Sequence, residues 1–191
     1  MKHLSIITGV ILVFTLQSAY VSGQTYIAHE GDLLILGTAN TRSWGLETRI
    51  IDCKAEMIFS GTTLINISAI AFTVDVKDLK GSNIWMNRNV YKALKSYPFD
   101  KIYFRGVYFK TTKTGENKYL SNIEGNLIIA GVTQITSLLV TTQVNPDGTI
   151  TCIGSKALKM SDFNIILPAF EKKRMNIGDE VILTFDIELS K

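Results

Sequence analysis

Apolar and polar residues alternate along much of this chain. In the last such run, Val181, Leu183, Phe185 and Ile187 share one face, and mostly polar residues share the other. Period-two alternation in segments rich in Ile, Val, Thr, Phe and Tyr is typical of β-strands with one buried face. The pattern predicts eight strands, at about residues 32–38, 47–59, 63–77, 100–112, 118–130, 133–144, 149–159 and 179–189.

Short turns separate most of these runs. Ser60-Gly61, residues 114–117, Ala130-Gly131 and residues 145–148 each contain turn-forming residues and link two apolar segments. Links of this length join antiparallel neighbours. All three prolines lie outside the predicted strands, as the hydrogen bonding of a β-ladder requires; they are Pro98, Pro146 and Pro168.

Residues 82–95 break the strand pattern. Ser82 is a suitable N-cap, Ile84, Tyr91 and Leu94 fall near one helical face, and a proline follows the segment. We therefore predict one helix of about three turns between the third and fourth strands.

Eight long antiparallel strands leave two exposed edges unless the sheet closes, which favours a barrel. The third strand repeats the apolar face with Ile70, Phe72 and Val74, and the fifth repeats it with Ile123 and Leu127. An outer-membrane barrel would place apolar residues outward, so these faces indicate an apolar lumen. The predicted fold is all-β with one inserted helix: an eight-stranded antiparallel, lipocalin-like barrel. Its lumen is either filled by side chains or open to one small ligand.

The N-terminus has the features of a secretory signal peptide. A short positive start is followed by a mostly apolar run over residues 4–16 and by small residues up to Gly23. The run is too short for a membrane anchor, which needs about 20 apolar residues. We predict a signal peptide at 1–23, a single mature domain at 24–191 that does not span a membrane, and a periplasmic or secreted location.

Composition excludes several classes of function. The chain has 191 residues, 46% of them hydrophobic, and a net charge of +3 with no basic face, so a nucleic-acid partner is not expected. Only His29 would survive cleavage, which disfavours histidine-based metal sites and catalytic triads. No metal or cofactor motif is present in the sequence. The basic run at residues 171–174 is interpreted as a solvated loop, with contact to an anionic surface as the alternative.

Two further groups of residues bear on chemistry. Cys53 and Cys152 both fall on inward faces of strands that are not neighbours, which favours buried free thiols over a disulfide across the lumen. Asp52 and Glu56 form a candidate pair of catalytic carboxylates. They lie on the outward face of the second strand, where solvated charge is the better interpretation, so we predict that the protein is not an enzyme.

Several segments resemble YceI-like proteins of the Bacteroidetes type. Residues 37–44 (Gly-Thr-Ala-Asn-Thr-Arg-Ser-Trp) are similar to the family's Gly-Thr-Ser-Asn-x-x-x-Trp opening. Further matches follow in order at residues 91–95, 97–98, 102–104, 125–133 and 161–165, and together they cover nearly the whole mature chain. Ala39 departs from the family's serine, and Arg42-Ser43 replaces its frequent His-Asp.

The resemblance implies a barrel that binds a long-chain amphiphilic lipid, such as a polyisoprenoid, without catalysis. The alternative is a ligand-free barrel that acts as a structural or stress-related interaction protein. The sequence leaves open the identity of the lipid and whether two barrels form a homodimer. The candidate lumen residues, with the two helical residues Trp85 and Met86 as a lid, are Phe72, Val74, Trp85, Met86, Phe104, Leu127, Ile129, Leu138, Phe163, Leu183 and Phe185.

Overall fold

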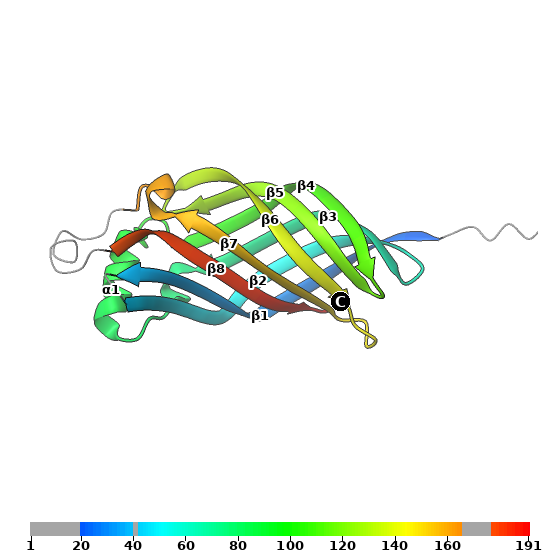
Figure 1. Ribbon diagram of the computed structural model, residues 1–191, viewed down its shortest axis with the longest axis horizontal. Coiled ribbons are helices and arrows are strands. Elements are labelled where there is room, and N and C mark those ends of the chain that lie inside the picture. Colours follow the sequence, from blue (N-terminus) through cyan, green and yellow to red (C-terminus); the bar gives the residue numbers. More distant parts are fainter. Residues whose placement is uncertain (1–19, 40–41, 166–176) are drawn as a thin grey trace, which may run out of the picture.

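The computed structural model describes residues 20–39, 42–165 and 177–191. Eight antiparallel strands form a closed barrel in chain order, and the last strand pairs with the first (Figure 1). This confirms the predicted fold. The strands are β1 (Val21–Ala39), β2 (Arg42–Ser60), β3 (Thr63–Asp75), β4 (Lys101–Gly115), β5 (Lys118–Ile129), β6 (Val132–Val144), β7 (Ile150–Lys159) and β8 (Ile177–Leu189).

The first two strands are longer than the sequence pattern predicts. β1 begins at Val21 instead of residue 32, and β2 begins at Arg42 instead of residue 47. The ladder between β1 and β2 contains two register shifts, one between Ala28 and Glu30 and one between Glu30 and Leu33. A bulge changes which face each following residue occupies, so a single alternation cannot span both halves of the strand.

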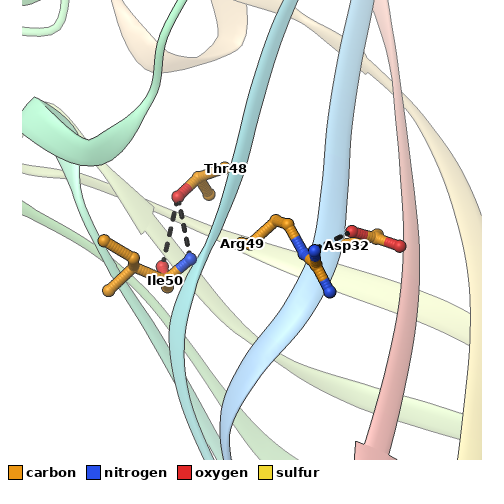
Figure 2. Close-up of polar contacts among 4 residues, drawn as sticks. All are labelled: Asp32, Thr48, Arg49 and Ile50. Carbon is orange, nitrogen blue, oxygen red and sulfur yellow. Dashed lines mark hydrogen bonds and ion pairs between the residues drawn. The ribbon is translucent and has the colours of Figure 1, made fainter.

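Polar contacts mark the site of the second shift (Figure 2). The Thr48 hydroxyl accepts a hydrogen bond from the backbone N–H of Ile50 at 3.1 Å. On the outer face, the Arg49 guanidinium lies 3.2 Å from the Asp32 carboxylate. Both partners of this ion pair are exposed, so it contributes little to stability.

One α-helix, α1 (Ile84–Ala93), lies between β3 and β4 as predicted, and Figure 1 shows it at one end of the barrel. The predicted N-cap was wrong by one residue. The side chain of Asn83, rather than Ser82, accepts the hydrogen bond from the Met86 N–H, at 2.9 Å. Asn83 has extended backbone angles, as an N-cap residue requires.

Two short 3₁₀ helices complete the α1 end of the barrel: η1 (Val76–Asp78) and η2 (Met160–Phe163). The Tyr91 hydroxyl of α1 donates hydrogen bonds to the backbone carbonyl of Lys77 in η1, at 2.8 Å, and to that of Leu79 just after it, at 3.1 Å. The Ser161 hydroxyl of η2 donates a 2.6 Å hydrogen bond to Asp179 of β8. These bonds fix both 3₁₀ segments to their neighbours.

Some sequence predictions lie outside the described residues. They are most of the signal peptide, Pro168 and the basic run at residues 171–174. Within the described ranges, none of the helices is both long and apolar enough to cross a bilayer.

Candidate ligand-binding cavity

A cavity of about 170 Å³ lies inside the barrel. Thirty described residues line it, from all eight strands, from α1 and from η2. The lining runs from Met57 and Leu189, near the strand ends opposite α1, to Val90 of α1, so the cavity follows the length of the barrel. Its lining is almost entirely aliphatic and aromatic, so most of its wall favours contact with an apolar chain.

Several inward-facing side chains are only partly buried. Ile35, Phe72, Leu138, Leu183 and Phe185 all line the cavity, yet each keeps some accessible surface. Their strands place these side chains toward the lumen, so the accessible surface faces internal space. Protein interiors are otherwise closely packed. The described side chains therefore leave the centre of this barrel unfilled.

The two ends of the barrel differ. At the end opposite α1, fully buried side chains fill the interior, including Tyr26, Phe59, Leu64 and Tyr119. The rings of Tyr26 and Phe59 lie 6.1 Å apart, and the Tyr119 hydroxyl accepts a 3.2 Å hydrogen bond from the Leu64 N–H. We call this the packed end. None of these four residues belongs to the described lining of the cavity, which runs from Met57 and Leu189, next to the packed end, to α1.

The structure brings eight of the eleven predicted lumen residues together on the cavity wall. They are Phe72, Val74, Phe104, Leu127, Ile129, Leu138, Leu183 and Phe185. The described part of the wall does not include Trp85, Met86 or Phe163. Whether any of these residues contacts a ligand stays a prediction.

The helix presents a different face to the cavity from the one expected for a lid. Val90, Ala93 and Leu94 line the cavity at the C-terminal end of α1. Trp85 is 69% exposed and lies with its ring 5.4 Å from the Arg88 guanidinium. Residues 85 and 86 belong to the first turn, whereas the residues one and two turns later meet the barrel. Phe163 is buried in η2 instead of reaching the cavity.

Cys53 and Cys152 face the cavity from β2 and β7 as free thiols, which confirms the sequence interpretation. Burial raises the pKa of the Cys53 thiol to about 12, and the nearby Cys152 adds to this rise. Burial likewise raises the pKa of Cys152 to about 12. Both groups therefore stay protonated at neutral pH, and neither is an activated nucleophile.

The candidate catalytic carboxylates lie elsewhere. Asp52 and Glu56 are on the outer face of β2, as predicted, and Asp52 lies 2.8 Å from the ring of the exposed His29. The cavity wall offers no carboxylate among its described residues. Within the described ranges, no group of three or more His, Cys, Asp or Glu side chains is placed to hold a metal ion.

The polar contacts at the α1 end have a structural role. The Ser161 hydroxyl and backbone N–H both donate to the Asp179 carboxylate, at 2.6 and 2.9 Å. These hydrogen bonds hold the pKa of Asp179 below its usual range. The link fixes η2, whose Met160 lines the cavity, against the start of β8.

Sequence reasoning missed one chemically distinct lining residue, Lys156 of β7. It shares the inward face with Cys152 and Leu158, and their alternation was the signal that could have identified it. Trp44 and Leu46 were also missed, because the first part of β2 lay outside the predicted strand.

Comparison with known proteins gives a consistent result. A model of the YceI-like domain matches residues 46–189. BcnA of Burkholderia cenocepacia has a similar structure, with a TM-score of 0.68, 18% identity, and coverage of 84% of this chain and 96% of that one. A structure described as a polyisoprenoid binding domain from Saccharophagus degradans, implicated in plant cell wall breakdown, gives a TM-score of 0.69 at 10% identity, covering 87% and 97%.

The YCEI protein of Campylobacter jejuni is also similar, with a TM-score of 0.53, 16% identity, and coverage of 100% of this chain and 99% of that one. At these identities the likeness shows a shared fold. No curated protein sequence matches the chain significantly. The family model spans most of the barrel, from the middle of the first hairpin to the end of β8. The chain therefore belongs to the YceI-like family.

Proposed function

We propose that this protein binds, and thereby carries or sequesters, one long-chain amphiphilic lipid in its lumen, with a polyisoprenoid or a similar chain as the ligand. The proposal rests on one observation: the inward side chains of the barrel leave an apolar cavity unfilled. Burying a chain there yields about 0.8 kcal/mol for each CH₂ removed from water, before ordering costs. The similar domain from Saccharophagus degradans, described as polyisoprenoid binding, supports the same class of ligand.

The proposed action is binding without catalysis. The described wall carries no carboxylate or histidine that could act as a general acid or base. Its two thiols are held protonated by burial, which raises the pKa of each. The apolar wall of the cavity therefore binds the lipid chain and takes no part in a reaction.

Native mass spectrometry of the protein purified gently from its own host tests this proposal. A stoichiometric lipid adduct is expected, and the same measurement reports whether two barrels associate. A ligand-free mass, together with no uptake of labelled polyprenyl or acyl lipids, would leave the ligand-free interaction protein as the better account.

A pair of variants on one strand tests the location of the site. Phe72→Asp places a carboxylate in the cavity wall, and Ile65→Asp places one on the outer face of β3, where Ile65 is 49% exposed. Uptake is expected to be abolished by the first change and retained with the second, with circular dichroism confirming that both fold. Equal uptake by both folded variants would contradict a lumenal site.

We also propose that the protein is exported and that its mature form begins at Gln24. Residues 20–23 are exposed or half-buried, and the first buried side chain of β1 is Tyr26, so cleavage after Gly23 would leave the barrel interior intact. N-terminal sequencing of the protein from a periplasmic or culture fraction is expected to start at Gln24. An intact N-terminus in a cytoplasmic fraction would contradict this proposal.

A further inference from the structure

Lys156 is the one charged side chain among the described residues that line the cavity. It lies on the inner face of β7 and is half-buried. Within the described part of the chain, it has neither an ion pair nor a hydrogen bond through its side chain. A charged side chain without a described counter-charge is unusual in an apolar wall, so its position there calls for a physical explanation.

The ladder fixes the depth of Lys156 in the barrel. Lys156 pairs with Leu183 of β8, and the next inward pair toward α1 joins Leu158 to Val181. β7 ends at Lys159, directly after that pair. The backbone of Lys156 therefore belongs to the second inward layer from the α1 end, and its side chain starts far from the packed end.

Lys156 is paired with a neighbouring strand on one side only. Hydrogen-bonded pairing of β7 with β6 ends at Gly154 and Val140. Lys156 lies two residues beyond this last pair and is flanked by a ladder only on the β8 side. At its level the barrel wall is therefore not closed by backbone hydrogen bonds to β6.

We propose that the bound lipid has an anionic head group and that the ammonium of Lys156 is its counter-charge. This inference rests on the proposed lipid-binding function. The tail extends from this layer toward the packed end, along the apolar wall, and the head stays near α1. An ion pair formed in this half-buried position gains more than one at a fully solvated surface, because water screens it less. A neutral head group would leave the lysine uncompensated.

The competing explanation is that Lys156 only covers apolar surface with its methylene stem while its ammonium reaches water. Two ligands with the same chain separate the two explanations. Geranylgeranyl phosphate carries an anionic head, and geranylgeraniol carries a hydroxyl. Binding of each is measured with the full barrel domain by displacement of a fluorescent lipid, at low and at physiological ionic strength.

The variants for this test come from one strand. Lys156→Met removes the charge and keeps an apolar stem of similar length. Lys159→Met is the matched control, because Lys159 lies on the same strand, points outward and is exposed. Lys156→Arg restores the charge. We expect the wild-type protein to prefer the phosphate by about tenfold or more, the scale of one charge-assisted contact. Lys156→Met should abolish that preference, while Lys159→Met and Lys156→Arg should keep it.

Each result has a distinct meaning. Equal binding of phosphate and alcohol by the wild-type protein, or an unchanged preference in Lys156→Met, would overturn the assignment of an anionic head while leaving lipid binding in place. If Lys159→Met also lost the preference for the phosphate, the assignment would be overturned, because the charge of the outer surface would then cause that preference. Failure of both ligands to bind the wild-type protein would count against the proposed function and the head-group assignment together.

Discussion

Cys53 and Cys152 are sensitive reporters of the lumen's polarity. Burial raises the pKa of each thiol from 9.0 to about 12 in the folded protein. Between these values the unfolded chain loses a proton that the folded protein keeps, so deprotonation favours unfolding. The thiols thus stabilise the fold below pH 9 and lose this contribution as the pH rises from 9 toward 12.

This predicts a pH-dependent stability that involves both thiols. In urea denaturation from pH 8 to 10.5, the free energy of unfolding should fall, by up to about 1.4 kcal/mol per pH unit for each thiol. The double variant Cys53→Ala, Cys152→Ala should show a shallower slope, even if its stability at pH 8 is lower. Parallel curves for the two proteins would show that other groups cause the dependence.

Gly125 of β5 is required by its close approach to β4. A Cβ atom there would lie 2.4 Å from the Arg105 carbonyl oxygen and 2.8 Å from the Phe104 ring. Backbone cannot yield as a flexible side chain does, so Gly125→Ala should destabilise the protein by about 1–3 kcal/mol in chemical denaturation. Gly115→Ala is the matched control, because its nearest atom is at an ordinary 3.6 Å. Similar losses in the two variants would contradict this explanation.

At the level of elements, the α1 N-terminus gives a direct test of the corrected cap. The Asn83 side chain accepts the Met86 N–H, whereas the Ser82 hydroxyl contacts side-chain atoms only. Asn83→Ala should therefore cost about 1 kcal/mol and speed hydrogen exchange in the first turn of α1. Ser82→Ala should change both by much less. The reverse order of effects would identify Ser82 as the true cap.

Alternation predicted the elements well where strands are regular. β5 to β8 were each found within two residues of their observed ends, and their inward faces form much of the cavity wall. The alternation pattern failed in the first hairpin. Register shifts on either side of Glu30 interrupt the alternation there, so the sequence reads as a polar loop instead of a continuous strand. Bulges are set by tertiary pairing, so a single-strand pattern does not reveal them.

The helix shows a second limit of sequence reasoning. Its existence and position followed from the broken alternation and the proline beyond it. Its orientation on the barrel did not, because Trp85 and Val90 are both apolar. In the structure Val90 meets the cavity, and the neighbouring Tyr91 is hydrogen-bonded to backbone carbonyls at η1. The alternation on β7 also places Lys156 on the inward face, but its charge made it an unexpected residue for an apolar lumen.

At the scale of the whole molecule, the barrel combines a packed end with an unfilled cavity. Leu64 is 3% exposed at the packed end, and Leu138 is half-buried on the cavity wall. The same substitution at these two positions therefore measures the free space at each. A tryptophan at position 64 must displace its neighbours, whereas one at position 138 can extend into the cavity.

Leu64→Trp should destabilise the protein by about 1–3 kcal/mol, the usual cost of overfilling a packed core. Leu138→Trp should cost clearly less in the ligand-free protein, because its ring occupies space that is already present. It should also weaken lipid binding, since the ring and the lipid chain compete for the same cavity.

The wild-type protein should gain thermal stability on adding geranylgeranyl phosphate, because a ligand that binds only the folded state stabilises it. Leu138→Trp should lose most of that gain. Equal destabilisation by both tryptophans, with no thermal shift in the wild type, would mean that side chains fill the lumen and that the barrel acts without a lipid.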